Sequence, residues 1–532
     1  MTARARLGLL GAYVAATFLS FPHAIPGGSI DLGLAFAWVG PALLLAGLRA
    51  LSPARAFTTA FLAGLAAHAA VLHWIYVVTV VYGEAPPIVG VVAPIGLAAY
   101  MAIHVGTFGW VAARLARARL DGPFALAAAW AALDLSRHHF LTGFPWAVLG
   151  YAQHRNPALL VLASYTGVVG LSFVTALGSF AGLGLLRAWR AGARPPREAW
   201  AALVAVALVH GAGFAALATD PAPGGERLRV ALLQGNVDQG VKWSPGFLEE
   251  TLARYERLTR EAAGKGARVV VWPETAVPGS IETDAGFRER LQNLAEETST
   301  TLVVGAVGIE LRKGEVHYFD SAYLFDTTGE IADRYDKSHL VPFGEYVPLR
   351  ELLGTFVGAV ARGIAPDNVT AGPGPRILSL PLAPAPGQLY DVAVPAGVPI
   401  CYELLFPDLV RHFVLDGGRL LLAITNDAWY GRTGAPYQFL AITALRSAET
   451  RTWTARAANT GVSALIDDRG RVRAETPIFE TTLLVEDVPL RSPGDAPSFY
   501  VRHGDVFGIG CAAATLLLLL AAWRRGRERS AA

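Results

Sequence analysis

The stretch VPICYE, residues 398–403, closes an apolar run that begins at Val392. This run, VAVPAGVPI, has the length and composition of a buried strand, and it delivers Cys401 to the end of that strand. The only other cysteine in the sequence is Cys511, which lies in a run apolar enough to be buried in a membrane. We therefore expect no disulfide at Cys401, which is either a small core residue or a nucleophile.

The composition excludes a simple soluble protein. Of the 532 residues, 53% are hydrophobic and only 17% are charged. The apolar residues crowd into 1–217 and 506–523. This distribution indicates a multi-span α-helical membrane protein with a soluble module inserted before its last span. The net charge of +2 gives no reason to expect nucleic-acid binding.

Eight segments approach the roughly 20 residues that a helix needs to cross the hydrocarbon core. They are 6–22, 29–48, 56–82, 88–113, 123–140, 158–186, 199–217 and 506–523. Arginines cluster in alternate gaps between these segments and in the C-terminal tail. By the positive-inside rule, both termini are expected in the cytoplasm and the soluble module on the outer side. In a bacterium, that module would face the periplasm from the inner membrane.

Ionisable side chains within apolar segments are candidates for function. Asp134, however, precedes Arg137 by three residues, so the two can form an ion pair near the end of one helix. No pair of intramembrane histidines, such as His68 and His104, has the spacing of metal ligands. We expect these residues to be structural.

Turn-forming linkers divide the chain. We assign 1–219 to a transmembrane domain with spans 1–7, 220–227 to a linker, 228–490 to the soluble domain, 491–505 to a second linker, 506–523 to span 8 and 524–532 to a cytoplasmic tail. Within the soluble domain, strand patterns at 228–236, 267–274, 301–308, 322–329, 392–400, 419–427 and a hairpin at 461–470 alternate with helical patterns at 248–258 and 287–294. This alternation predicts an α/β domain.

Further strand ends in this domain carry groups that could activate Cys401. Glu274 closes the apolar strand 267–274, where burial at the rim of a core would suit it to proton transfer. Lys337 and Glu345 stand on either side of a Pro/Gly turn that could aim both into one pocket. A glutamate can take the thiol proton, while a lysine favours the thiolate and later the oxyanion.

With these residues in this order, residues 228–490 resemble the nitrilase, or carbon–nitrogen hydrolase, superfamily, whose Glu-Lys-Cys triad follows the same order. The resemblance implies a four-layer αββα sandwich. It also implies that Cys401 is the nucleophile, Glu274 the general base and Lys337 the oxyanion stabiliser.

A closer resemblance covers nearly the full chain. The eight segments, Lys242-Trp243, the run HLVPFGEYVP at 339–348, the Cys401 motif and TNDAWYG at 425–431 are together similar to the apolipoprotein N-acyltransferase family. This similarity implies supporting or substrate-binding roles for Trp243, Glu345, Tyr402, Glu403, Asn426 and Trp429. One departure is Tyr437, at a position where the family pattern leads us to expect histidine.

The resemblance implies transfer of a fatty acyl chain from a membrane phospholipid, through a Cys401 thioester, to the N-terminal amino group of a diacylated apolipoprotein. This chemistry requires no metal and no other cofactor, and we expect a monomer. The alternative is a membrane-tethered amidase or hydrolase of nitrilase type, which shares the triad but passes the acyl group to water. A non-catalytic lipoprotein receptor is a further alternative, which the intact triad disfavours.

The segment 349–364 has apolar residues at helical spacing just after Glu345. We expect either simple packing against the sandwich or an interfacial arm that gates the access of lipid.

Overall fold

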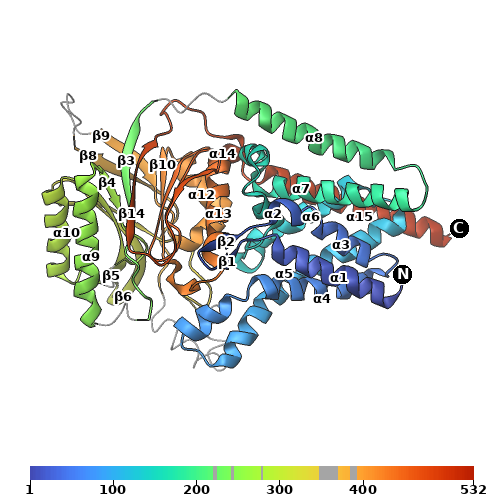
Figure 1. Cartoon of the computed structure of the whole chain (residues 1–532), viewed down its shortest axis with the longest axis horizontal. Coiled ribbons are helices and arrows are strands. Elements are labelled where there is room, and N and C mark those ends of the chain that lie inside the picture. Colours follow the sequence, from blue (N-terminus) through green and yellow to red (C-terminus); the bar gives the residue numbers. More distant parts are fainter. Residues whose placement is uncertain (220–224, 241–244, 277–278, 347–368, 384–391, 532) are drawn as a thin grey trace. The chain divides into compact units, whose positions relative to one another are not determined.

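The computed structural model describes residues 1–219, 225–240, 245–276, 279–346, 369–383 and 392–531. The chain forms two compact units (Figure 1). The helical unit comprises Met1–Tyr76, Ile88–Asp220 and Ser498–Ala532. The α/β unit comprises Val77–Pro87 and Pro221–Pro497.

The helical unit consists of helices and one short hairpin. Its helices are α1 (Ala3–Leu19), α2 (Gly33–Phe36), α3 (Gly40–Gly47), α4 (Pro53–Val71), α5 (Pro87–Ala118), α6 (Pro123–His139), η2 (Phe140–Thr142), η3 (Leu149–Gln153), α7 (Pro157–Arg190), α8 (Arg197–Ala218), α14 (Phe499–His503) and α15 (Val506–Ala531). The hairpin pairs β1 (His23–Ile25) with β2 (Gly28–Ile30). Among the described residues, five helices are long and apolar enough to cross a membrane, namely α4, α5, α7, α8 and α15.

The predicted count of eight spans is therefore not confirmed. Helices α1 and α6 have 17 residues each, which corresponds to about 25 Å of helix against about 30 Å of hydrocarbon. The predicted segment 29–48 does not form one helix but contains the short helices α2 and α3. Residues 37–39 separate them, and Pro41 lies in the first turn of α3, where a helix tolerates its missing N–H. The segment 56–82 is also interrupted, since Val77–Tyr82 forms a separate π-helix, η1.

Helix α7 is the most buried of these five helices and contacts α6, α8 and α15. It bends at Gly167, whose φ of 64° lies in the left-handed region. The ring of Tyr500 occupies the space that a side chain at this position would need. The bend therefore requires glycine both for its backbone conformation and for its packing.

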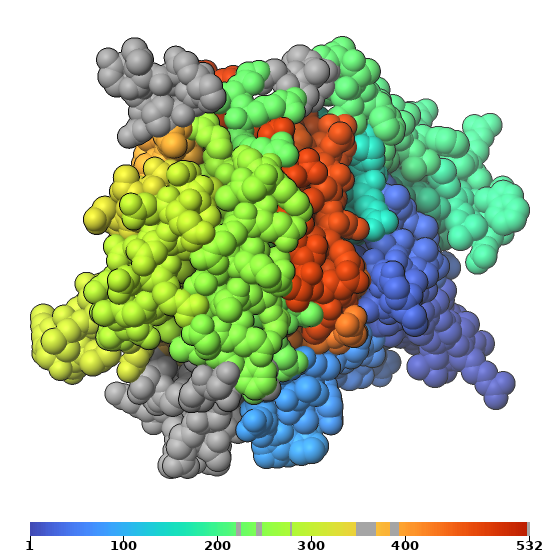
Figure 2. Space-filling view, turned by 60° about the vertical axis from the view of Figure 1, so that its left-hand side comes forward, coloured from blue at the N-terminus to red at the C-terminus, as the bar shows by residue number. Residues whose placement is uncertain are grey.

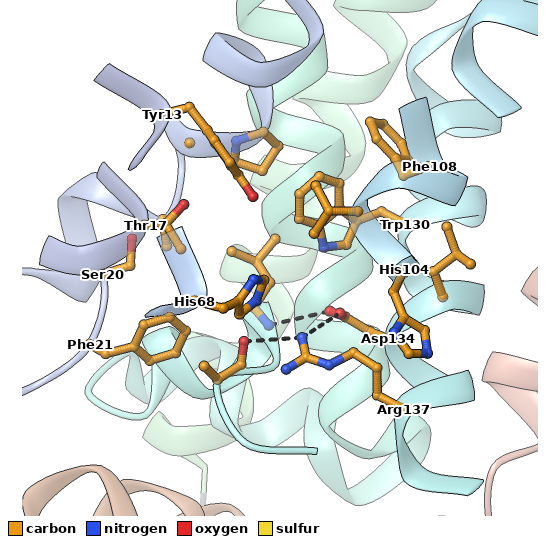
Figure 3. A pocket seen from close by; sticks show the side chains of 17 residues that line it. Tyr13, Thr17, Ser20, Phe21, His68, His104, Phe108, Trp130, Asp134 and Arg137 are labelled. Atoms are coloured by element: carbon orange, nitrogen blue, oxygen red, sulfur yellow. Dashed lines mark hydrogen bonds and ion pairs between the residues drawn. The ribbon is translucent and has the colours of Figure 1, made fainter. Parts of the chain in front are cut away.

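A mostly apolar cavity with a few polar side chains lies inside the helical unit (Figure 3). Asp134 and Arg137 line it and form an ion pair with an N–O distance of 3.5 Å, which confirms the predicted pairing. His68 and His104 line the same cavity, and each ring donates from Nδ1 to the carbonyl four residues earlier. These contacts are intrahelical and favour the structural interpretation of all four residues.

The α/β unit contains two six-stranded sheets, with the orders β14-β3-β4-β5-β6-β7 and β13-β12-β11-β10-β9-β8. Its strands are β3 (Arg227–Gln234), β4 (Val269–Val271), β5 (Thr301–Arg312), β6 (Glu315–Phe325), β7 (Ile331–Asp336), β8 (Ile377–Leu382), β9 (Val392–Gly397), β10 (Leu420–Thr425), β11 (Thr454–Ala458), β12 (Ala464–Ile466), β13 (Val472–Glu475) and β14 (Thr482–Pro489). Its helices are α9 (Pro245–Gly264), α10 (Ala285–Thr298), η4 (Cys401–Leu405), α12 (Pro407–Leu415), η5 (Asp427–Tyr430) and α13 (Ala435–Thr450).

Helices cover the outer face of each sheet. Figure 2 faces α9 and α10, which connect the parallel strands β3, β4 and β5 and pack on that sheet through residues such as Leu252 and Leu291. On the other sheet, α12 contacts β9, and α13 contacts β11 and β12. Contacts of β3 with β11 and of β7 with β8 join the two sheets. The unit is thus layered αββα, and central strands such as β4, β10 and β11 are buried because both of their faces are covered.

The structure contains a strand at each predicted strand position, although β4, β9 and β10 are shorter than predicted. Sequence patterns did not predict β7, β8 and β14. Strand β14 pairs with β3 along its whole length, from Thr482 opposite Gln234 to Pro489 opposite Arg227. The chain therefore returns to the first sheet before it leaves the unit.

Candidate active site

Cys401 lies at the end of the strand that the sequence predicted. An isolated parallel bridge joins Ile400 to Ile424 beyond the last residue of β9, so the chain stays beside β10 up to the cysteine. Cys401 then has a φ of 45° and begins η4. A left-handed conformation is strained for a residue other than glycine and persists only where its surroundings hold it. The cysteine is therefore held at a tight turn between strand and helix.

The structure brings Glu274 and Lys337 together beside this turn. Glu274 follows β4, Lys337 follows β7, and Lys337 Nζ lies 3.0 Å from Glu274 Oε1. The charges of Glu274 and Lys337 both act on the Cys401 thiol, which lies beside them. The other oxygen, Glu274 Oε2, accepts a hydrogen bond from the backbone N–H of Asn426 at 2.7 Å. Three residues predicted from separate strand ends thus share one buried cluster, to which Asn426 contributes its backbone.

The backbone around Glu274 depends on a close approach to β5. A Cβ atom at Gly305 would overlap the carbonyl of Pro273. The backbone N–H of Ala276 donates to the Gly305 carbonyl at 2.8 Å, on the other side of Glu274. Glycine at this position allows the segment that carries Glu274 to lie directly on the strand.

Two further carboxylates contact the lysine. Glu345 Oε1 lies 2.5 Å from Lys337 Nζ, and Glu345 Oε2 accepts from the backbone N–H of Val341 at 2.8 Å. Asp320 Oδ2 lies 3.3 Å from Lys337 Nζ. Sequence reasoning missed Asp320, because β6 was expected to begin only at residue 322 and no motif surrounds this aspartate. Only the register of β6 on β7, in which Ser321 lies opposite Asp336, reveals that Asp320 reaches Lys337.

Burial and these contacts determine the ionisation of the site. Burial raises the pKa of the Cys401 thiol well above its usual value, and the negative charge of Glu274 adds to the effect. Burial also acts to raise the pKa of Glu274, but the charge of Lys337 and several hydrogen bonds outweigh it and hold this pKa below its usual value. Although burial opposes its charge, Lys337 has a raised pKa because Glu274 and Glu345 surround it. The resting site therefore contains a neutral thiol beside an ionised carboxylate and an ammonium group.

Glu403 connects the turn at Cys401 to the segment that follows Lys337. Its Oε1 accepts hydrogen bonds from the Tyr335 hydroxyl and from the Ser338 backbone N–H, each at 2.7 Å. Its Oε2 accepts from the backbone N–H of Ile400 at 2.8 Å. These contacts place Glu403 in a positioning role, since its carboxylate is fully buried and occupied by backbone and hydroxyl donors.

Three other predicted supporting residues surround the cluster. The ring of Tyr402 contacts those of His339 and Phe406, with centroid distances of 5.7 and 5.2 Å. Asn426 also donates from Nδ2 to Gln239 Oε1 at 2.9 Å. Trp429 packs edge-on against Tyr82 of η1 at 6.4 Å. Tyr402, Asn426 and Trp429 therefore belong to the walls around the cluster.

Some predictions fall outside the described residues. These are Trp243 and the segment 349–364. Tyr437, where histidine was expected, lies on α13 and packs against a cluster that includes Leu440 and Val462. The presence of tyrosine in place of the expected histidine at position 437 therefore affects the packing of α13.

A family model described as Carbon-nitrogen hydrolase matches residues 229–497. A second, described as Apolipoprotein N-acyltransferase N-terminal domain, matches residues 15–181. The fold and the Glu-Lys-Cys cluster thus define a carbon–nitrogen hydrolase class of protein joined to apolar helices.

Similarity to whole proteins is more specific. The apolipoprotein N-acyltransferase of Geobacter metallireducens is 39% identical over 95% of this chain and 93% of its own. Those of Pseudomonas putida and Vibrio cholerae are 35% and 31% identical, over 84% and 93% of this chain and 85% and 93% of their own. The chain belongs to the apolipoprotein N-acyltransferase family.

An amidase of the nitrilase superfamily from Nesterenkonia aligns at 22% identity and a TM-score of 0.37, over 53% of this chain and 96% of its own. This likeness is too low to add to the argument.

Proposed function

We propose that this chain transfers a fatty acyl group from a membrane phospholipid to the N-terminal α-amino group of a diacylated apolipoprotein. The observation that carries the proposal is the buried pair of Glu274 and Lys337, 3.0 Å apart, whose charges act on the Cys401 thiol. A thiol needs a base to become a nucleophile, and the developing oxyanion needs a positive partner. Membership of the family supports the acyl acceptor, and the apolar helices support a lipid donor.

In the first half-reaction, the Cys401 sulfur attacks the ester carbonyl of the phospholipid. Because the thiol is neutral at rest, its proton passes to Glu274 as the C–S bond forms. Lys337 and the backbone N–H of Tyr402 stabilise the oxyanion. The ester C–O bond then breaks, and Glu274 returns its proton to the departing lysophospholipid oxygen. The products are a lysophospholipid and a thioester on Cys401.

In the second half-reaction, the α-amino group of the diacylglyceryl-cysteine attacks the thioester carbonyl. Glu274 accepts a proton from the amine, and the C–S bond breaks to release the amide. The sulfur leaves as a thiolate and is then protonated, which restores the resting site. The order is ping-pong, because the donor product leaves before the acceptor reacts at the same cysteine.

The supporting residues act through this cluster. Glu345 holds Lys337 at 2.5 Å, and Glu403 fixes the turn at Cys401. We assign substrate-binding roles to Trp243, Tyr402, Asn426 and Trp429. The chemistry needs no metal or other cofactor, and one copy of the chain carries the whole cluster, so we propose that the enzyme acts as a monomer.

The proposal includes a topology. The chain crosses the bacterial inner membrane eight times, with α1, the interrupted pair α2 and α3, and α6 adding to the five longer helices. Both termini lie in the cytoplasm, and residues 228–490 face the periplasm, in line with the arginine distribution.

Intact-mass spectrometry of protein drawn from its membrane tests the proposal. We expect a fatty-acyl mass increment that maps to Cys401 and is absent from Cys401→Ala. Purified protein is then incubated with phospholipid and a diacylated lipopeptide, and we expect lysophospholipid together with N-acylated peptide. Free fatty acid without acylated peptide would instead identify a hydrolase. Full biological function of Cys401→Ala would identify a non-catalytic receptor.

A further inference from the structure

Three carboxylates surround one ammonium group in the candidate active site. Lys337 Nζ lies 2.5 Å from Glu345, 3.0 Å from Glu274 and 3.3 Å from Asp320. Oxygen atoms of the three carboxylates lie within 4.8 Å of one another. The proposed reaction uses Glu274 as base and Glu345 as a support for the lysine, but it gives Asp320 no part.

The charges in this cluster do not balance if every group is ionised. Three carboxylates and one ammonium would leave two net negative charges, while Lys337 is 1% exposed and Asp320 is 8% exposed. Like charges this close in a buried site strongly disfavour one another, so one carboxyl group retains its proton.

The hydrogen-bond donors identify which carboxyl group this is. Glu274 and Glu345 each accept from Lys337 with one oxygen and from a backbone N–H with the other. Asp320 has only the longest of the three lysine contacts, and among the described residues no donor reaches its Oδ1 atom. Carboxylate oxygens of Asp320 and Glu274 lie within 4.8 Å of each other, and both carboxyl groups flank the Lys337 ammonium. Two carboxyl groups can share a hydrogen bond only when one of them carries a proton.

We propose that Asp320 is a positioning residue that stays protonated and donates a hydrogen bond to Glu274, which keeps Glu274 ionised and oriented toward Cys401. This inference rests on the proposed function and adds a residue to it. Asp320 keeps its own proton throughout the cycle, since only the thiol proton moves to Glu274 and onward to the leaving group. The hydrogen bond is strongest when Glu274 is ionised, so it favours the form of the base that accepts the thiol proton.

The groups around Asp320 agree with this assignment. The charged groups that face Asp320 are Glu274 at the end of β4, Lys337 at the end of β7 and Glu345 in the turn after Lys337. Its cross-strand partner on β5 is the uncharged Val307. Burial first and the negative charge of Glu274 second raise the pKa of Asp320 well above its usual value. The pKa of Glu274 moves in the opposite direction.

The test compares Asp320→Asn with Asp320→Ala. Asparagine keeps a donor and has no charge, so we expect acylation of Cys401 within about threefold of the wild-type rate and an unchanged acid limb of the pH–rate profile. Alanine removes the donor, so we expect a loss of roughly tenfold or more and an acid limb displaced to higher pH. Ser321→Ala is the matched control on the same strand, because Ser321 bonds Asp336 at 2.6 Å rather than the cluster; its pH profile should match the wild type.

Two outcomes would overturn the inference. If Asp320→Asn loses as much activity as a folded Asp320→Ala, the site needs an ionised aspartate. If both variants keep the wild-type rate and acid limb, Asp320 positions nothing. If Asp320→Ala fails to fold, Asp320→Asn alone tests the inference. A slower rate or a displaced acid limb in Asp320→Asn would then show that the site needs an ionised aspartate.

The acyl donor separates this inference from the proposed function. Acylation is followed by intact mass with phospholipid and, in parallel, with p-nitrophenyl butyrate. If wild-type protein reacts only with the activated ester, the proposed phospholipid donor is wrong, while the comparison of the Asp320 variants remains readable on the ester.

Discussion

Glu403 accepts a hydrogen bond from the Ser338 backbone N–H at 2.7 Å and thereby fixes the residue that directly follows Lys337. The same carboxylate accepts from the backbone N–H of Ile400, directly before Cys401. One side chain thus holds the segments of the lysine and of the nucleophile in register. Burial raises the pKa of Glu403, but its many donors replace the water that it loses.

The first prediction concerns this connection. Glu403→Gln replaces one acceptor oxygen by a donor that faces backbone N–H or hydroxyl groups. We expect a loss of roughly 1–3 kcal/mol in stability, the cost of leaving buried donors unsatisfied. We also expect slower acylation of Cys401, because the turn loses its fixed position. Thermal unfolding in detergent and intact mass measure the two effects. Glu310→Gln, on the exposed end of β5, is the control and should change neither.

A second prediction concerns the pH dependence of acylation. Glu274 must be ionised to accept the thiol proton, and its pKa lies below the usual 4.5. The wild-type rate should therefore persist to about pH 5 and fall only at lower pH. In Lys337→Met, the charge that lowers this pKa is absent while burial, which raises it, remains, so the acid limb should move to higher pH.

Lys337→Met should also lose about 100-fold or more in rate with the oxyanion partner gone. Rates of acylation measured by intact mass across pH test both effects. Lys265→Met is the control, because Lys265 pairs with Glu261 at the exposed C-terminal end of α9, away from the cluster. An unchanged acid limb in Lys337→Met would show that the lysine does not control the ionisation of Glu274.

The third prediction separates base catalysis from simple thiol ionisation. Glu274→Gln removes the proton acceptor, so acylation should fall by about 100-fold or more. The negative charge of Glu274 raises the pKa of Cys401, so its removal should lower that pKa. Alkylation of Cys401 by iodoacetamide at alkaline pH should then become faster. The measurement uses a Cys511→Ala background, in which Cys401 is the only cysteine. A parallel fall of both rates would contradict the assignment of Glu274 as general base.

The fourth prediction concerns the bend in α7. Gly167→Ala places a side chain at a φ of 64° against the ring of Tyr500. We expect it to destabilise the protein by roughly 1–3 kcal/mol, the cost of backbone strain at such a position. Gly182→Ala is the matched control in the same helix, since nothing lies within 4 Å of the added atom. It should be neutral or stabilising by about 0.5–1 kcal/mol. Thermal unfolding in detergent compares the two, and equal stability would contradict the packing argument.

The sequence by itself determined most of the strands of the α/β unit and the chemistry that the ends of these strands carry. Apolar runs of strand length end at Glu274 and Cys401, and the arrangement of apolar segments separates the helical part from the α/β part. These are local signals, since the period of apolar residues and the residue at a strand end depend on no distant partner. The break between α2 and α3 was not predicted, because apolar residues lie on both sides of it.

Only the tertiary structure decided how these elements complete the site. Asp320 reaches Lys337 through the register of β6 on β7, and the Asn426 backbone reaches Glu274 because the end of β10 lies beside it. Strand register follows from pairing between residues far apart in the chain, and a slip of one residue would turn Asp320 to the opposite face. The triad could therefore be predicted from its flanking sequence, whereas the groups that fix its ionisation could not.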